Sequence, residues 1–320
     1  MGLEDDFLKN DLDDEKTIEY IKNYLPQELK EKFTDDELYY FLDLIDEYRM
    51  ADGRAFSEAT PEEKSGNAVG QDATFSGDYR LSGLRAHRDN GREPRFYATI
   101  GFNGCVWPCT SYRGGDSSVK NYVTDYYSGG SASNLNDNNH RNRTGYTNRK
   151  YVNQDDCIVW EGTCKAKTYP MFRYAEVLLG YVEAMNEMES SYTDEEAQVT
   201  VTRDVDQMVS YFNQIRYRAG QPGITAADAS DQAKMRDLIK HERQIEFAFE
   251  GHRFWDVRRW KEGGFTSIGR MLITKNSDDS FTYTRSIKAL VWDDKMYFYP
   301  IPDSEIRKNP NLKQNPGWDK

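Results

Sequence analysis

The sequence predicts a mainly α-helical protein, built from tetratricopeptide-like helix pairs with long ordered loops and a few short strands. Three observations lead to this class. Apolar residues recur three and four positions apart through much of the second half of the chain. Glycine and proline end these runs at short intervals, which favours helices joined by compact turns. Long polar stretches, rich in glycine and asparagine, surround the few β-like segments.

Residues 1–48 are predicted to form short acidic helices that are separate from the rest of the chain. Thr34 and Glu37 have the spacing of a capping box, and an apolar stripe over residues 38–45 follows them. The composition then changes, so a boundary is expected before residue 49. The remainder, residues 49–320, is expected to hold the main fold.

The first part of that remainder, residues 49–168, is predicted to be rich in loops. The stretch RFYATIGF (residues 95–102) combines aromatic and β-branched residues and is predicted to be a strand. Residues 51–93 are predicted to be irregular. Residues 108–150 are dense in Gly, Ser and Asn, and a structureless loop of that length often forms a binding surface.

The last part, residues 169–320, is predicted to contain a helical scaffold followed by a C-terminal coil. Apolar stripes at helical spacing predict helices over residues 170–185, 205–219 and 231–249. Gly220, with a proline two residues later, marks the end of the second helix. Short strands and proline-rich coil are expected after the third.

Composition narrows the classes of function. The chain has 320 residues, with 54 acidic against 42 basic ones, and a net charge of −12. This balance argues against a nucleic-acid partner or an anionic membrane surface, which both require a basic face. The sequence has neither glycine-rich nucleotide motif, so no cofactor is predicted. The N-terminus lacks the basic start and apolar middle of a signal peptide.

The sequence does not decide whether the four cysteines form disulfides or remain free thiols. Their spacings are C-x3-C and C-x6-C, and no histidine lies close by in sequence to complete a zinc site. No metal is therefore predicted. Two disulfides and four buried thiols are equally compatible with the positions of Cys105, Cys109, Cys157 and Cys164.

Residues 241–260, HERQIEFAFEGHRFWDVRRW, are rich in charged side chains. They could form either an active site or a structural network of ion pairs. His241 and Glu242 begin a zinc-peptidase motif, but Ile245 stands where the second histidine would be needed. Glu242, Glu246 and Glu250 fall four residues apart on one helix face. Carboxylates at this spacing suit the acid–base chemistry of a glycoside hydrolase, but nearby arginines favour a structural ion-pair network. No catalytic residue is predicted.

The loop over residues 104–127 is the candidate ligand-binding region. Flat aromatic rings among polar residues suit the apolar faces of sugars or peptide side chains, with charged groups supplying hydrogen bonds. The alternative for each single ring is that it fixes the loop to the protein core. The candidate ligand-binding residues are Trp107, Tyr112, Arg113, Tyr122, Tyr126 and Tyr127.

Four motifs together resemble the SusD/RagB family in order and spacing: YPMFRYAEVLLGYVEAMNE, FNQIRYRAG, ERQIEFAFEGHRFWDVRRW and YPIPDSEIRKNPNLKQNPGW. The resemblance covers residues 49–320. It implies a helical, tetratricopeptide-like lipoprotein at the outer-membrane surface of Bacteroidetes. Such a protein is not an enzyme; it binds a polysaccharide, an oligosaccharide or a peptide. Its partner is a SusC-like TonB-dependent transporter, which takes up the nutrient.

The resemblance also marks a set of residues as a structural signature of the scaffold. They are Arg173, Glu176, Arg216, Arg218, Glu242, Arg243, Glu246, Glu250, Gly251, Arg253, Asp256, Arg259 and Trp260. The chain departs from the family pattern because it has no lipobox cysteine and because residues 1–48 do not resemble the family. The alternative function is therefore a scaffold for protein contacts that does not bind a ligand, and a glycoside hydrolase is a more distant one.

Overall fold

The computed structural model describes residues 41–65, 91–132, 142, 144–189, 191–263, 267–289 and 292–318. The chain divides into two compact units, Met1–Tyr40 and Phe41–Lys320, and all described residues belong to the second. The predicted capping box at Thr34 and Glu37 lies outside them. Helix α4 (Phe41–Glu47) opens the second unit, and Leu44, Ile45 and Tyr48 are buried in its core.

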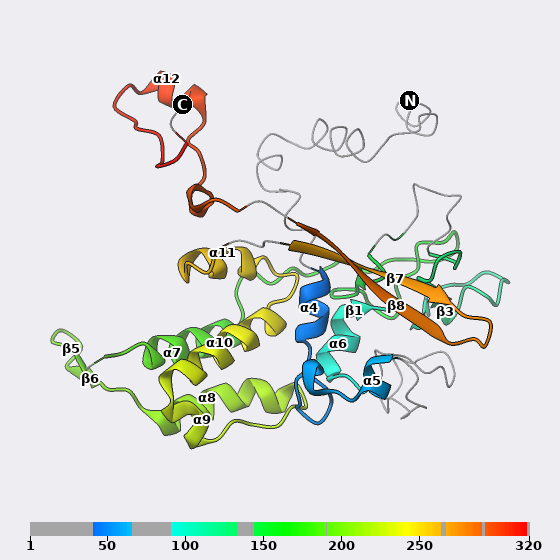
Figure 1. The fold of residues 1–320 in the computed structure, drawn as a ribbon, viewed down its shortest axis with the longest axis horizontal. Coiled ribbons are helices and arrows are strands. Elements are labelled where there is room, and N and C mark those ends of the chain that lie inside the picture. The colour runs from blue at the N-terminus through cyan, green and yellow to red at the C-terminus, as the bar shows by residue number, and fades with distance from the viewer. Residues whose placement is uncertain are drawn as a thin grey trace. The chain divides into compact units, whose positions relative to one another are not determined.

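The helical scaffold has the predicted order, and the fold class is confirmed. It consists of α7 (Tyr174–Asn186), α8 (Val205–Arg218), α9 (Ala226–Ser230), α10 (Gln232–Glu246) and α11 (His252–Arg259). Figure 1 shows α7, α8 and α10 lying side by side. Helix α7 begins four residues later than predicted, and α10 ends at Glu246 because residues 247–250 form a turn.

Polar caps and one glycine explain where these helices begin and end. The carboxylates of Asp204 and Asp231 accept hydrogen bonds from the third residue of α8 and α10, at 3.0 Å in each case. After α8 the backbone turns at Gly220, whose φ of +70° suits a residue without a Cβ.

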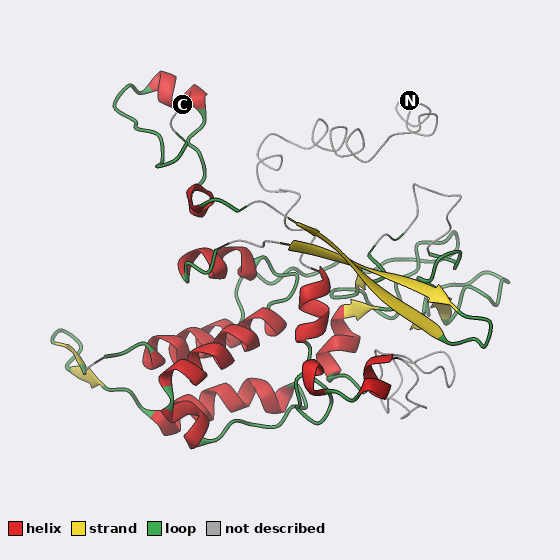
Figure 2. Ribbon diagram, viewed as in Figure 1, coloured by secondary structure: helices red, strands yellow, loops and turns green. Residues whose placement is uncertain are grey.

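The other half of the unit combines α4 and α6 (Pro94–Thr99) with paired strands (Figure 2). β1 (Ile100–Gly101) pairs with β4 (Thr147–Asn148), and β2 (Cys105–Trp107) pairs with β3 (Tyr122–Thr124). The longest strands form a hairpin, β7 (Ser267–Lys275) with β8 (Phe281–Ala289). The sequence predicted only short strands after Trp260.

The predicted strand over residues 95–102 is wrong for most of its length. Pro94 opens helix α6 there, and only Ile100 and Gly101 are extended. Proline is favoured in the first turn of a helix, and the helix buries Phe96 and Tyr97 against Phe102. Aromatic residues favour strands because their side chains pack well on the surface of a sheet. Here they pack on other aromatic residues of the core, and that packing overrides the preference.

The remaining elements are short. They are η1 (Phe56–Glu58), α5 (Pro61–Ser65), β5 (Tyr192–Asp194) paired with β6 (Val199–Val201), η2 (Asp294–Tyr297) and α12 (Asp303–Lys308). Two of these are helical turns within residues 51–93, which the sequence predicted to be irregular. None of the helices in the described ranges combines the length and apolar character that a bilayer span requires.

Helix α10 connects the two hydrophobic cores of the unit. Met235 and Ile239 pack with α7 and α8, whereas Ile245 near its end packs with α4, α6 and the hairpin. Glu242 and Arg243 lie between these two groups in sequence, and Glu246 directly follows Ile245. The position of α10 therefore brings its glutamates to the junction of both halves.

Candidate functional site: an ion-pair network and a loop surface

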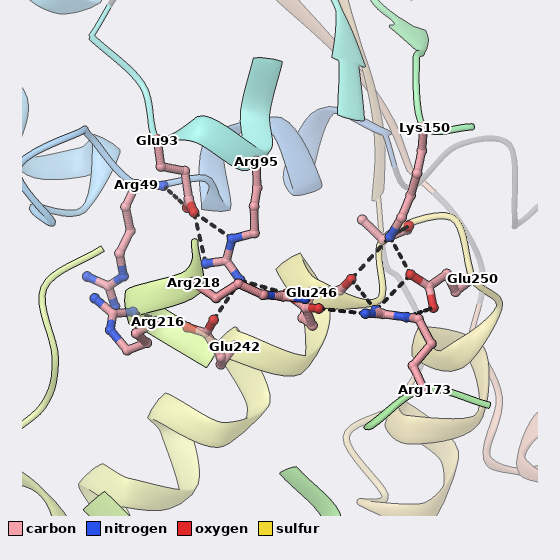
Figure 3. A network of polar contacts seen from close by, with 11 residues as sticks. Arg49, Glu93, Arg95, Lys150, Arg173, Arg216, Arg218, Glu242, Glu246 and Glu250 are labelled. Carbon is pink, nitrogen blue, oxygen red and sulfur yellow. Dashed lines mark hydrogen bonds and ion pairs between the residues drawn. The ribbon is translucent and has the colours of Figure 1, made fainter. Parts of the chain in front are cut away.

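The three glutamates of the charged stretch lie in an ion-pair network at this junction (Figure 3). Its members are Glu93, Arg95, Lys150, Arg173, Arg216, Arg218, Glu242, Glu246 and Glu250. They come from α6, the loop before α7, α8, α10 and the turn after it. Every carboxylate in the network contacts at least one guanidinium or ammonium group. The network therefore joins segments that are far apart in sequence.

Glu242 is almost fully buried, at 1% exposure of its side chain. Its two oxygens accept from different arginines, Arg95 at 2.6 Å and Arg216 at 3.1 Å. Burial by itself raises the pKa of Glu242, but these guanidinium groups outweigh burial and hold the pKa below its ordinary value. A glycosidase acid needs a raised pKa, so this environment opposes the hydrolase alternative.

Glu246 and Glu250 share a guanidinium group. Arg173 donates to both carboxylates at 2.8 Å, and Arg218 adds a contact of 2.5 Å to Glu246. Burial raises the pKa of Glu246, and its hydrogen bonds to Arg218 and Arg173 lower it further than burial raises it. Lys150 reaches Glu250 at 2.5 Å and also donates to the carbonyl oxygens that end α10. These contacts join the loop-rich half to the helices.

A second ion-pair group closes α11 against α10 and α7. Arg243 donates to both oxygens of Asp256, at 2.9 and 3.0 Å. Arg259 bridges Asp256 to Glu183, which also accepts a hydrogen bond from the indole of Trp260 at 2.7 Å. These contacts join four residues of the predicted signature to Glu183 of α7.

The other signature residues have weaker contacts or a backbone role. Glu176 lies 3.9 Å from His252, and Arg253 lies 3.9 Å from Glu262. Gly251 precedes α11 with a φ of +80°, a conformation that favours glycine.

Acid is expected to destabilise the protein in two steps. Burial and the neighbouring Arg49 lower the pKa of His241, so the unfolded chain takes up a proton first as pH falls through 6.5. Because the folded pKa values of Glu242 and Glu246 are lowered, their contribution is complete above 4.5 and is lost as pH falls below it. Each such group lowers the free energy of unfolding by about 1.4 kcal/mol per pH unit. Urea titrations between pH 7 and 3 measure this slope.

The Glu242→Gln variant is the control for that assignment. It removes one titrating group while keeping the shape of the side chain. Below pH 4.5 the free energy of unfolding is then expected to depend less steeply on pH, by about 1.4 kcal/mol per pH unit, because one proton fewer is taken up. An unchanged slope in this variant contradicts the role assigned to Glu242.

The six candidate ligand residues lie in different environments. Tyr112 and Tyr126 are buried, and Asn103 accepts a hydrogen bond from the Tyr126 backbone. Trp107 is half-buried, with the Arg149 guanidinium 4.8 Å from its ring centre. Burial gives these three rings a packing role in this structure.

The other three candidates are more accessible. Tyr127 is half-buried and packs on Phe281, with ring centres 5.6 Å apart. Tyr122 is 42% exposed on β3, and Arg113 is exposed on the loop before it. The structure therefore does not place all six residues on one exposed face. Their part in ligand binding stays a prediction.

The most exposed aromatic residue near this region is one that sequence reasoning missed. Trp160 is 88% exposed, and Ile158 beside it is 94% exposed. The signal was present in the sequence, because Ile158, Val159 and Trp160 form an apolar run between polar stretches, directly after Cys157. Large apolar side chains at such exposure mark contact sites when they occur together.

Hydrogen bonds join the loop of Trp160 to the predicted ligand loop. The backbone N–H of Thr110 donates to Gln154 O, and that of Arg113 donates to Glu161 O, both at 3.0 Å. We call the surface formed by residues 109–116 and 154–164 the loop surface. It presents Trp160 together with the charged side chains of Arg113 and Glu161.

A second apolar surface lies at the start of the helical scaffold. Tyr169, Met171, Phe172, Tyr174 and Val177 are all between 45% and 97% exposed. A groove of about 490 Å³ adjoins them, lined by Arg173, Tyr174, Ala175, Leu178, Gln214, Ile215 and Arg218. We call these exposed residues and the groove the apolar strip.

The comparisons with known proteins agree on one family. The SusD family model matches residues 6–318, so the match begins well before residue 49, where the resemblance seen in the sequence motifs begins. SusD-like protein P2 of Formosa agariphila is 30% identical over 163 aligned residues, which cover 49% of this chain and 27% of that protein. The ion-pair network and helix pairs described above fall within the matched range.

Two solved structures have a similar fold. A SusD-like protein of Bacteroides fragilis aligns with a TM-score of 0.60 and 30% identity, over 86% of this chain and 46% of that one. The protein BT4246 aligns with a TM-score of 0.62 over 86% of this chain and 43% of its own, and at 24% identity it bears on the fold alone. The chain therefore spans less than half the length of each relative.

Proteins of this family are generally non-catalytic binding proteins, associated with the outer membrane. That description fits a charged junction in which each glutamate is paired with an arginine or lysine side chain. Because the family model covers nearly the whole chain, and because a curated relative and solved structures point the same way, this chain belongs to the SusD family.

Proposed function

We propose that this chain binds a glycan at the loop surface without cleaving it, and delivers it to a SusC-like TonB-dependent transporter at the bacterial cell surface. The observation that carries the proposal is the indole of Trp160, 88% exposed on a loop that hydrogen bonds hold in place. Family membership supports a nutrient- or glycan-binding role.

The loop surface has the groups that a sugar requires. An exposed indole face offers apolar area to the C–H groups of a pyranose ring. Arg113 and Glu161 lie on the two joined loops, and their side chains supply donors and acceptors for sugar hydroxyl groups. The loops are also fixed by their shared hydrogen bonds, which lowers the entropic cost of binding.

Affinity electrophoresis through gels that contain single polysaccharides tests the proposal, with release of reducing ends measured alongside. We expect one class of polysaccharide to retard the protein without new reducing ends. Trp160→Ala is expected to weaken that binding by about 10- to 30-fold, the effect of losing an aromatic anchor.

Trp255→Ala is the matched control, because Trp255 is also an exposed tryptophan, at 61%, but lies on α11. It is expected to leave retardation unchanged. New reducing ends would instead establish a hydrolase. Equal weakening by both substitutions contradicts a site at the loop surface.

A second candidate function is a scaffold for protein contacts, and the apolar strip favours it. Exposed apolar patches of this kind mark surfaces that meet another protein. A chain that melts cooperatively but is retarded by no polysaccharide supports this candidate over the first.

A further inference from the structure

Three of the four cysteines gather where the two loops of the loop surface meet. Cys105 lies apart from them, fully buried in β2 within the core of α4 and α6. Cys157 is buried, Cys109 is half-buried and Cys164 is exposed. The sequence left the pairing of these thiols open, and the structure separates one thiol from the other three.

Hydrogen bonds hold the two cysteine-bearing loops together on both sides of the thiols. Next to Cys109, the N–H of Thr110 donates to Gln154 O at 3.0 Å. The hydroxyl of Ser111 donates to Thr163 O at 2.9 Å and accepts from Thr163 N at 3.0 Å. The backbones beside Cys109 and Cys157 are thus already fixed relative to each other.

The side chain of Cys157 is also confined. Its N–H donates to Thr163 O at 3.0 Å, which folds the loop back on itself. A Cβ placed on Gly162 would lie 2.6 Å from Cys157 Cβ and 2.7 Å from its Sγ, so only glycine fits there. The backbone of Gly162 therefore lies close against the side chain of Cys157.

Cys109 faces this sulfur. The Cys109 thiol lies beside that of Cys157, and Cys164 lies near enough to act on it electrostatically. Its backbone has a φ of +48°, a strained conformation for a residue with a Cβ, which persists only where surrounding contacts impose it. Burial first, and then the two neighbouring cysteines, raise the pKa of the Cys109 thiol to about 11.

We propose that Cys109 and Cys157 form a disulfide that cross-links the two loops of the loop surface, and that Cys164 stays a free thiol. Proteins associated with the outer membrane leave the reducing cytosol, and disulfides persist in such compartments. The proposal does not depend on glycan binding, because it concerns only the loops and their thiols.

The reaction is a thiol–disulfide exchange with a disulfide oxidant, for which oxidised glutathione serves as the probe. One thiolate attacks the oxidant's sulfur, the oxidant's S–S bond breaks and one reduced glutathione leaves. The second thiolate attacks the mixed disulfide, the Sγ–Sγ bond forms and a second glutathione leaves. The two protein thiols lose two electrons and two protons, and the oxidant is reduced to two thiols.

The environment favours a structural disulfide over a redox switch. Reduction of a disulfide is slow when the leaving thiol has a high pKa, and the thiol of Cys109 does. The cross-link would close a loop between residues 109 and 157 and restrict the unfolded chain accordingly.

Mass spectrometry of the intact chain tests this directly. The protein is equilibrated in a glutathione redox buffer, alkylated with N-ethylmaleimide, and digested without reduction. We expect a cross-linked peptide pair that contains Cys109 and Cys157, and an alkylated Cys164. In the native protein Cys105 is expected to react only after denaturation, because it is fully buried.

Serine variants supply the controls. Cys164→Ser is expected to keep the cross-link, and reduction is expected to lower its melting temperature by roughly 5–10 °C, as in the unchanged protein. Cys109→Ser is expected to lose both the cross-link and the sensitivity of its melting temperature to reductant. Circular dichroism confirms that each variant is folded.

Either of two results overturns the proposal. One is a cross-link between Cys157 and Cys164, and the other is alkylation of Cys109 and Cys157 at every oxidant ratio while the chain is folded. Loss of polysaccharide binding without loss of the cross-link would count against the proposed glycan site alone.

Discussion

Glu242→Ala is expected to lower the free energy of unfolding by about 3–5 kcal/mol, the usual effect of removing one partner from a buried ion pair. The loss is large because Arg95 and Arg216 both direct guanidinium groups at this carboxylate, and Arg216 is itself buried. Removal of the carboxylate takes from Arg216 the carboxylate that it pairs with, and leaves Arg95 with Glu93 and Glu246. Urea unfolding at pH 7, followed by circular dichroism, measures the change.

Glu187→Ala is the matched control for burial. Its carboxylate has contacts of similar geometry, two bonds from Arg236 at 2.7 and 2.6 Å, but both side chains are about 40% exposed. Exposed pairs contribute about 0.2–1 kcal/mol because water solvates the separated charges well. Equal losses in the two variants would show that burial does not set the strength of the network.

Removal of residues 1–48 is expected to abolish cooperative unfolding, whereas removal of residues 1–40 is expected to preserve it. The longer deletion takes away Leu44, Ile45 and Tyr48, which are at most 7% exposed. Each large side chain lost from a core costs about 2–5 kcal/mol. Three such losses are together comparable to the roughly 5–15 kcal/mol that stabilises a typical protein. The shorter deletion ends at the boundary between the two compact units.

This pair of deletions also tests the domain boundary that was predicted from the sequence. A folded product from residues 49–320 alone would support the predicted boundary before residue 49. Thermal melts followed by circular dichroism distinguish a cooperative transition from its absence. The Leu44→Ala variant in the full chain serves as the intermediate case, with an expected loss of about 2–4 kcal/mol.

Local signals in the sequence are sufficient to predict the helical scaffold. Helices α7, α8 and α10 could be predicted because each carries its own apolar stripe, and the end of α8 could be predicted because Gly220 follows it. These are local signals, since a residue three or four positions away decides which face is buried. Three of the four family motifs overlap these helices, and the fourth, over residues 299–318, includes α12.

Local signals failed where packing between distant segments decides the structure. Phe96 and Tyr97 favour a strand by composition, but they lie in a helix because Phe102 and Tyr48 surround them. The exposed aromatic residue of the loop surface was missed because the exposure of a loop side chain depends on which other loop lies against it. Sequence pattern carries no such information.

The ion-pair network depends both on local sequence signals and on packing between distant segments. The spacing of Glu242, Glu246 and Glu250 predicted that they share a helix face and require cations. The sequence pointed to arginines nearby in the chain as partners, yet Arg95, Arg173 and Arg216 come from 147, 73 and 26 residues away. The helix period places Glu242 and Glu246 on one face, whereas Glu250 lies in the turn after α10 and joins Glu246 through Arg173. Which cations reach these carboxylates depends on the tertiary fold, because long-range contacts follow from how whole elements pack.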